Sequence, residues 1–359
     1  MKPINKHVTR DDVAKVAGVS PATVSYVVNN GPRPVSAETR QKVLDVIHES
    51  GYTPNAVARS LRLQKTTTLG LILPDTLNPY FAEVARGVEQ YAFENGYTLI
   101  LCHSDYSIER EIQYVNVLQS ERVAGVIWFP ATSDPKPALM LADYEINLVV
   151  LDRNVSGIDC PSIVADNYKG GCLATQHLID LGHRDIGCIA RPFDLEHSQE
   201  RIKGFMATLR ENGLPVDPTR IVKGGFRLED GRTATFHLLD EHPTITAIFA
   251  YNDFMAIGAL RAAHERSLRI PQDISIVGFD DLPQAQFTYP TLTTIQQPKF
   301  EMGKQGAKLL LDLINGKSPS KQGLKPLNVK LVVRESTGAR PQSSMYNTIE
   351  SITSDRSAN

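Results

Sequence analysis

Chemically active side chains recur in this chain at one kind of position, directly after short apolar runs that are typical of β-strands. The run 148–151, for example, leads straight into Asp152 and Arg153. Ligands of open α/β sheets bind beyond the carboxyl ends of the strands, so side chains at equivalent strand ends should meet in one cleft. Aspartate accepts hydrogen bonds, arginine donates them and aromatic faces cover apolar ring faces, which together suit a sugar. The predicted cleft residues are Asn78, Tyr80, Phe81, Asp152, Arg153, Arg201, Phe226, Asn252, Asp280 and Gln297.

The elements that must position these residues form an alternating series from residue 67 onward. Strand-like runs alternate with amphipathic helical stretches, which predicts right-handed βαβ units and parallel sheets covered on both faces. So many strands fit two lobes better than one sheet. The expected strands are 69–73, 98–103, 125–129, 148–151, 162–165, 186–189, 221–225, 247–250, 274–278, 292–296 and 329–333. The expected helices are 80–95, 108–120, 169–181, 199–212, 229–240, 252–266 and 300–315.

A second region with a functional pattern lies before residue 67, ahead of the alternating strands and helices. Thr9 and Ser20 have the residue types expected at helix N-caps, and Gly18 between them can end the first helix in a left-handed conformation. Two short helices joined by a three-residue turn have the spacing of a helix-turn-helix, whose second helix enters the major groove of DNA. A third helix, capped by Ser36 and running to about residue 50, completes an all-α core.

Charge is distributed unevenly between these regions. The first 65 residues carry ten Lys or Arg and five Asp or Glu, a net charge of +5, and the whole chain carries −2, which leaves −7 for the remainder. A basic head on an acidic body fits a phosphate-binding module attached to a part that avoids DNA. The four cysteines lack C-x-x-C spacing and predict reduced core residues and no metal site. Without a membrane-length apolar segment or a signal-peptide pattern, a cytoplasmic location is expected.

The first region resembles the headpiece of lactose-repressor (LacI/GalR) family regulators. The similar segments are TRDDVAKVAGVSPATVSYVVN, VSAETRQKV and GYTPNAVARSL, nearly without gaps. The resemblance implies a homodimer that binds a pseudo-palindromic double-stranded operator, with Leu61 of a hinge helix as a minor-groove wedge and Ala58 as its neighbour. Tyr26 departs from the usual arginine or histidine, so the operator cannot be inferred from relatives. The implied DNA-binding residues are Thr9, Ser20, Pro21, Ala22, Thr23, Ser25, Tyr26, Asn29, Val35, Asn55, Ala58, Leu61 and Arg62.

The body resembles the rest of such a regulator and also the periplasmic sugar-binding proteins, especially those for ribose. The resemblance implies a periplasmic-binding-protein-like core of two Rossmann-like lobes, and it assigns the ten predicted cleft residues to the ligand. Tyr80 replaces a phenylalanine of those proteins. The expected function is that of a repressor whose operator affinity is controlled by ribose or a similar monosaccharide through lobe rotation. Whether the sugar releases or strengthens repression is not determined by the sequence.

The resemblance also sets the expected domain boundaries. The chain should cross from one lobe to the other near residues 166, 296 and 328. The tail is rich in Ser and Thr and without periodicity, so it is expected to be disordered. The expected domains are a headpiece over 7–53, a hinge helix and linker over 54–66, a core over 67–340 and a tail over 341–359. Within the core, the expected N-lobe is 67–166 plus 297–327 and the C-lobe is 167–295 plus 328–340.

Three alternatives remain open. Much of the chain also resembles purine-responsive repressors, although these have Asp-Trp where this chain has Asp152-Arg153. A catabolite-control regulator with a protein corepressor would need a basic patch on the body, which is net acidic. An exported sugar-binding protein or an α/β enzyme is disfavoured by the headpiece and by the lack of a Walker loop, a G-x-S-x-G elbow or a dinucleotide motif. No enzyme activity and no cofactor are therefore expected.

Overall fold

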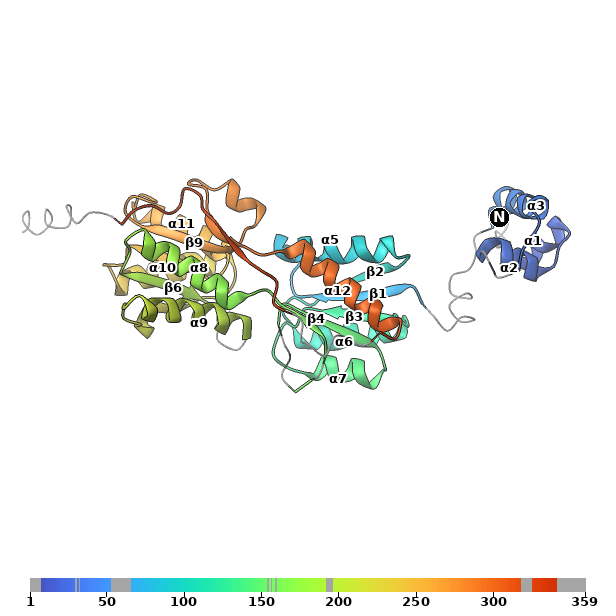
Figure 1. Ribbon diagram of the computed structural model, residues 1–359, viewed down its shortest axis with the longest axis horizontal. Helices are drawn as coiled ribbons and strands as arrows, with labels where there is room; N and C mark the ends of the chain where they lie inside the picture. Colours follow the sequence, from blue (N-terminus) through green and yellow to red (C-terminus); the bar gives the residue numbers. More distant parts are fainter. Residues whose placement is uncertain are drawn as a thin grey trace, which may run out of the picture. The chain divides into compact units, whose positions relative to one another are not determined.

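The computed structural model divides the chain into two compact units, residues 1–66 and 67–359, and each is described here by itself (Figure 1). The residues that it describes are 8–29, 31, 33–52, 66–153, 155, 157–158, 160–191, 196–317 and 325–340. The predictions for Asn55, Ala58, Leu61, Arg62 and the tail 341–359 concern residues outside this described set.

The described residues of the first unit form three helices, α1 (Arg10–Ala17), α2 (Pro21–Asn29) and α3 (Ala37–Ser50). Thr9 caps α1, because its side chain accepts a hydrogen bond from the backbone N–H of Asp12, and Gly18 ends the helix at φ 64°. The helices pack around a small apolar core of Val13, Ala14, Ala17, Val24, Val27 and Val43. This arrangement is the expected helix-turn-helix with a third supporting helix.

The second unit consists of two α/β lobes (Figure 1). The N-lobe has a parallel sheet in the order β2-β1-β3-β4-β5. Its strands are β1 (Thr68–Leu73), β2 (Thr98–His103), β3 (Gly125–Trp128), β4 (Asn147–Leu151) and β5 (Ser162–Ile163). The helices α5 (Pro79–Glu94) and α12 (Lys299–Ile314) lie on one face of the sheet, and α6 (Ile108–Ser120) and α7 (Lys136–Asp143) on the other.

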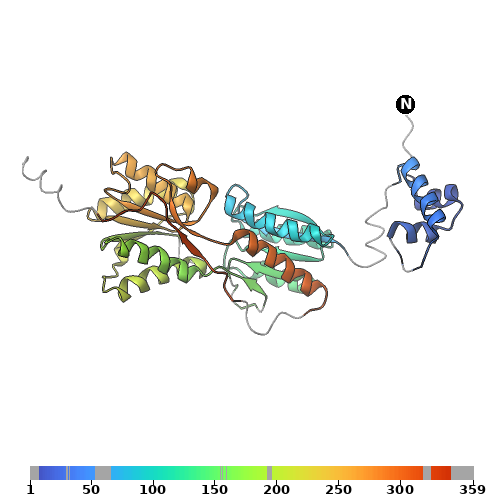
Figure 2. The same ribbon diagram turned by 45° about the horizontal axis from the view of Figure 1, so that its top comes forward.

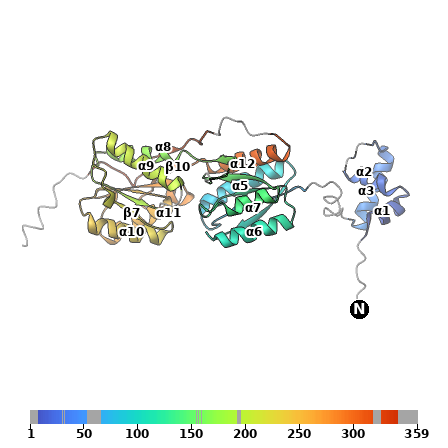
Figure 3. The same ribbon diagram turned by 90° about the horizontal axis from the view of Figure 1, so that it is seen from below.

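The C-lobe has a six-stranded sheet in the order β11-β10-β9-β8-β6-β7, in which only β11 runs antiparallel to its neighbour. Its strands are β6 (Ile186–Ala190), β7 (Ile221–Lys223), β8 (Ala247–Ala250), β9 (Ser275–Asp280), β10 (Thr293–Gln296) and β11 (Lys330–Val332). Figure 3 shows α8 (Asn167–Asp180) and α9 (Glu196–Glu211) on one side of the sheet, and α10 (Leu228–Glu241) and α11 (Asp253–Glu265) on the other. Two short 3₁₀ turns, Pro218–Arg220 and Pro283–Gln286, complete the lobe.

The chain passes between the lobes three times (Figure 2). It crosses after β5, again between β10 and α12, and finally between α12 and β11. Two of these crossings lie side by side, because the backbone N–H of Asp166 donates to the carbonyl of Leu327 at 2.9 Å and that of Leu327 donates to Val164 at 2.8 Å. The described crossings therefore form a paired connection about which the lobes can rotate.

The elements agree with the expected ones within a few residues, with two exceptions. Helix α7 was missed, because it is short and its N-cap position is Pro135, which provides no side-chain cap. The expected strand 162–165 is shorter than predicted, since Ala165 forms only an isolated bridge to Leu327 at the crossing.

Each main pair of neighbouring helices meets backbone to backbone at glycines. A Cβ atom on Gly171 of α8 would lie 2.2 Å from the carbonyl oxygen of Arg201 in α9, and one on Gly204 of α9 would lie 2.2 Å from that of Tyr168. Such contacts leave no room for any side chain. The helix that carries Arg201 is therefore held against α8 without adjustable side chains between them. The other pairs are Gly87 with Gly303 in α5 and α12, and Gly231 with Gly258 in α10 and α11.

Candidate effector-binding cleft and headpiece surface

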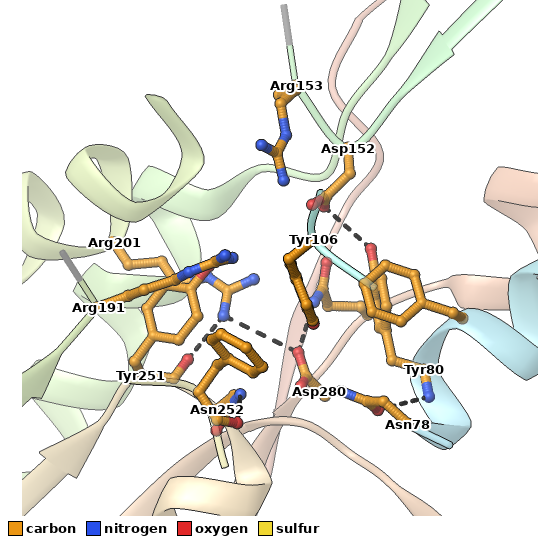
Figure 4. A pocket seen from close by; sticks show the side chains of 13 residues that line it. Asn78, Tyr80, Tyr106, Asp152, Arg153, Arg191, Arg201, Tyr251, Asn252 and Asp280 are labelled. Atoms are coloured by element: carbon orange, nitrogen blue, oxygen red, sulfur yellow. Dashed lines mark hydrogen bonds and ion pairs between the residues drawn. The ribbon is translucent and has the colours of Figure 1, made fainter. Parts of the chain in front are cut away.

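The strand ends of both lobes border one small cavity, of about 40 Å³ (Figure 4). All ten residues predicted to form a cleft line it. Three further lining residues, Tyr106, Arg191 and Tyr251, were missed by the sequence analysis. The same rule could have found them, because Arg191 and Tyr251 directly follow β6 and β8, and Tyr106 comes three residues after β2.

The C-lobe side of the cavity is organised around Arg201 of α9. Its Nε donates to Asn167 Oδ1 at 2.8 Å, its Nη1 donates to the carbonyl of Tyr251 at 2.6 Å, and its guanidinium lies 3.6 Å from the ring centroid of Phe279. Nη1 also lies 3.9 Å from Asp280 Oδ1. Arg201 is only 3% exposed, so these contacts are formed away from water and hold the guanidinium in place before any ligand arrives.

Asp280 completes this side. Its Oδ1 accepts a hydrogen bond from Gln297 Nε2 at 2.7 Å. Burial raises the pKa of the Asp280 carboxyl to about 6, against the opposing effect of Arg201, so the group is mainly ionised at neutral pH. Asp280 and Asp152 both have positive φ, 125° and 73°. Non-glycine residues rarely adopt such conformations, and they concentrate at functional sites.

Two predicted ligand residues also serve as helix caps. Asn78 Oδ1 accepts from the backbone N–H of Tyr80 at the start of α5, and Asn252 Oδ1 accepts from that of Met255 at the start of α11. Asp253, the first residue of α11, does not cap the helix. Asp253 is fully buried and instead accepts from Thr294 Oγ1 and from the backbone N–H of Leu282.

The N-lobe side is less completely paired. Tyr80 donates its hydroxyl hydrogen to Asp152 Oδ1 at 3.0 Å. The neighbouring Arg153 is only 5% exposed, and its Nε and Nη1 atoms have no hydrogen-bond partner among the described residues. Burial lowers the pKa of the Arg153 guanidinium, and the nearby charge of Arg191 acts in the same direction. Buried donors without acceptors are unfavourable, so this side is incomplete without a ligand.

A buried acid in the N-lobe also influences Arg153. Glu111 of α6 is 0% exposed, and its Oε1 accepts from Trp128 Nε1 at 2.9 Å and from the backbone N–H of Ala131 at 2.8 Å. Burial raises the pKa of the Glu111 carboxyl to about 7. The sequence analysis did not single out Glu111. Its carboxyl is thus partly protonated near neutral pH and compensates the charge of Arg153 incompletely.

Aromatic residues from the two lobes meet at the cavity. The rings of Tyr106 and Phe226 have their centroids 4.2 Å apart, and the guanidinium of Arg191 lies 5.4 Å and 5.1 Å from these two centroids. Tyr106 follows β2 of the N-lobe, whereas Phe226 follows β7 of the C-lobe. This contact therefore joins the lobes across the cleft.

Most of the predicted DNA-binding residues that the structure describes lie at the N-terminus and in the first turns of α2. Ser20 caps the helix, because its Oγ accepts from the backbone N–H of Thr23 at 3.1 Å. Ser20, Pro21 and Ala22 are exposed, and Thr23, Ser25 and Tyr26 are half-buried. Thr9 is exposed at the start of α1, and the Asn29 side chain lies outside the described residues.

Val35 differs from the exposed members of this set. It is half-buried and packs against the apolar core of the headpiece, so part of its side chain is used in folding.

A helix-turn-helix unit followed by two lobes with a cleft between them defines a class of protein, the ligand-responsive DNA-binding regulators. Comparison with known families agrees. Residues 9–55 match the family described as bacterial regulatory proteins of the lacI family, and residues 66–333 match the periplasmic binding proteins and sugar-binding domain of the LacI family. The chain belongs to the LacI family of transcriptional regulators, and it is a DNA-binding regulator and not an enzyme.

Curated relatives match nearly the whole chain. The transcriptional repressor PurR of Pasteurella multocida is 38% identical over 92% of this chain and 99% of its own length. The transcriptional regulator DegA of Bacillus subtilis is also 38% identical, over 91% of this chain and 97% of its own length.

Solved structures of the family are similar as well. The lac repressor dimer bound to operator and the anti-inducer ONPF has a TM-score of 0.84 at 31% identity, covering 93% of this chain and 100% of that one. A LacI family regulator from Enterococcus faecium with bound ribose has a TM-score of 0.68 at 34% identity, covering 76% and 98%. Within the described residues, no helix is long and apolar enough to cross a membrane.

Proposed function

We propose that this LacI-family regulator binds a pseudo-palindromic operator as a homodimer and that a monosaccharide of the ribose type, bound in the cleft, controls its operator affinity. The cleft carries this proposal. Its lining places acceptors on Asp152 and Asp280, donors on Arg153, and amides on Asn252 and Gln297 around one small cavity. Vicinal hydroxyl groups both donate and accept, so a sugar can satisfy both kinds of partner. The similarity to the ribose-bound regulator adds support.

A purine or nucleoside effector is the second candidate, and the curated relatives favour it over the sugar. Three relatives named PurR are 38% to 40% identical to this chain and each covers more than 90% of it. DegA matches at the same level, however, so overall identity does not by itself distinguish effectors. The contact between Tyr106 and Phe226 favours the sugar, because rings with centroids 4.2 Å apart leave no slot between them for a planar base.

The homodimer is supported by exposed apolar side chains on the core. Phe93 of α5 and Leu101 of β2, an edge strand, are exposed in the N-lobe, and Phe287 and Tyr289 are 87% and 99% exposed in the C-lobe. Exposed apolar groups of this size are typical of interaction surfaces. Light scattering of the full chain should give the mass of a dimer, and a stable monomer at micromolar concentration would contradict this part of the proposal.

The test of the proposed function combines DNA and effector binding. An operator is first selected from random duplex DNA with the full chain. Its dissociation constant is then measured with and without ribose, other pentoses, hexoses, nucleosides and purine bases. A sugar that changes operator affinity and stabilises the protein against heat supports the proposal. If only purines or nucleosides change the operator affinity, the proposed sugar effector is wrong and the second candidate takes its place.

A matched pair of headpiece variants tests the DNA surface. Tyr26→Ala should weaken operator binding or change its base preference, since Tyr26 lies on the helix expected to enter the major groove. Val16→Ala, an exposed position of α1, should leave binding unchanged. Equal effects of the two substitutions would contradict the assignment of Tyr26.

A further inference from the structure

Two arginines, one from each lobe, face the same cleft. Arg153 comes two residues after β4 of the N-lobe, Arg191 directly follows β6 of the C-lobe, and both line the cavity (Figure 4). Within the described part of the chain, neither of them forms an ion pair, and Arg191 contacts the rings of Tyr106 and Phe226 instead. Arg191 is thus held by its aromatic neighbours, and its hydrogen-bond donors remain available for a ligand.

The acidic groups of the cleft are engaged elsewhere. Asp280 lies beside Arg201 and accepts from Gln297, and Asp152 accepts from Tyr80. Three arginines and two aspartates line the cavity, so with all five ionised the lining carries one excess positive charge. A neutral ligand would leave this excess in place in a site that is largely shielded from water, which is unfavourable.

We propose that Arg153 and Arg191 form an anion subsite and that the effector carries a carboxylate or phosphate group. The inference rests on the proposed function, because it assigns a chemical class to the ligand of the same cleft. The guanidinium fork matches the planar oxygens of a carboxylate and the oxygens of a phosphate. Arg153 supplies two buried donors that have no partner among the described residues, and Arg191 supplies the second charge from the other lobe.

The subsite also provides a physical cause for lobe closure. Two guanidinium groups on opposite lobes repel each other when the cleft closes around a neutral ligand. An anionic group between them replaces this repulsion by two attractions. Such a ligand therefore binds the closed state more tightly than the open one, which is the condition for shifting the equilibrium between them.

The test is calorimetric titration of the full chain with matched ligands that differ in charge. Ribose is compared with ribonate and with ribose 5-phosphate, and adenosine with adenosine 5′-monophosphate. The wild-type chain should prefer a charged member of one series by about tenfold or more, because charge-assisted hydrogen bonds are roughly twice as strong as neutral ones. Ribonate and ribose 5-phosphate distinguish a carboxylate from a phosphate.

Two variants make the test specific. Arg191→Gln should abolish this preference, measured as the ratio of the affinities for the charged and the neutral member of the series, because the variant removes the second charge of the subsite. Arg227→Gln is the control, because this substitution also removes one positive charge beside the Phe226 ring. The guanidinium of Arg227 lies 5.6 Å from the centroid of that ring, but Arg227 is exposed and does not line the cavity. The preference should survive in Arg227→Gln.

The outcomes separate the two proposals. Equal binding of neutral and charged members to the wild-type chain, or an unchanged preference in Arg191→Gln, overturns the anion subsite and leaves the effector cleft intact. Absence of binding by every member of both series overturns the effector classes proposed for the cleft, and the subsite with them.

Discussion

The two lobes of the core share one architecture but hold their cleft residues in different ways. In the C-lobe, Arg201 has partners in Asn167, Tyr251 and Asp280 before a ligand binds. In the N-lobe, Arg153 is equally buried, yet two of its nitrogens have no partner among the described residues. The difference indicates that the C-lobe presents a preorganised surface, whereas the N-lobe side becomes complete only when a ligand supplies acceptors.

The largest effect expected from this comparison is on the preorganised side. Arg201→Ala should destabilise the core by about 3–5 kcal/mol and abolish effector binding, because it leaves Asp280 and Asn167 buried with fewer partners. Urea unfolding measures the change. Arg210→Ala, an exposed position of the same helix, is the control and should have little effect. Equal stability of the two variants would contradict the difference between the lobes.

The second effect concerns the unpaired interior of the N-lobe. The pKa of Glu111 is raised from 4.5 to about 7, so the folded state binds this proton more tightly than the unfolded state does. The resulting stability is fully present at low pH and is lost as the pH rises from about 4.5 through 7. Glu111→Gln keeps an acceptor for Trp128 without the charge. It should therefore gain stability over the wild type by at most about 3 kcal/mol at pH 8 and by little at pH 5.

Urea unfolding of both chains at the two pH values checks this prediction. A difference between Glu111→Gln and the wild type that stays the same at pH 5 and pH 8 would mean that ionisation of Glu111 is not the cause.

The third effect distinguishes binding from folding at Arg153. Arg153→Met should weaken effector binding by about 10- to 100-fold, in proportion to one or two lost charge-assisted hydrogen bonds. Its unfolding free energy should stay the same or rise by about 1 kcal/mol, because donors without partners are removed from the interior. Titration and urea unfolding on one preparation measure both. A loss of stability as large as that of Arg201→Ala would show that Arg153 has a structural partner.

The smallest effect is expected at Tyr80. Tyr80→Phe removes the hydroxyl that donates to Asp152 at 3.0 Å but keeps the ring that packs beneath the cleft. Effector affinity should fall by about fivefold to tenfold, because the typical net contribution of one hydrogen bond is about 1 kcal/mol. Calorimetric titration measures the change. Unchanged affinity would mean that this hydroxyl does not orient Asp152 for the ligand.

Much of the fold could be predicted from the sequence, because buried parallel strands and amphipathic helices have strong and different periodicities. The cleft was predictable for a topological reason, since polar residues at the carboxyl ends of parallel strands converge. Arg191 and Tyr106 follow this rule and were nevertheless missed, because the ligand set implied by the resemblance does not include them. Helix α7 was missed because it lacks a polar cap.

Other features depend on tertiary contacts that no local pattern shows. Glu111 lies four residues before Val115 and seven before Leu118, on the apolar side of α6, but its burial depends on Trp128 from another element. Asp253 has a residue type that is common at helix caps, but its carboxylate instead connects the segment after β9 with β10. Position along the chain therefore predicted which residues are near the cleft better than it predicted which partners they have.

The close approach of α8 and α9 has a consequence for genetics. Gly171 does not line the cavity, yet a methyl group there would lie 2.2 Å from the carbonyl oxygen of Arg201 and would displace this residue. In a screen for alleles with altered regulation, Gly171→Ala should therefore be recovered with the same phenotype as substitutions of Arg201. The positions that control the effector response would then include Gly171, a buried glycine of α8 that does not contact the cavity.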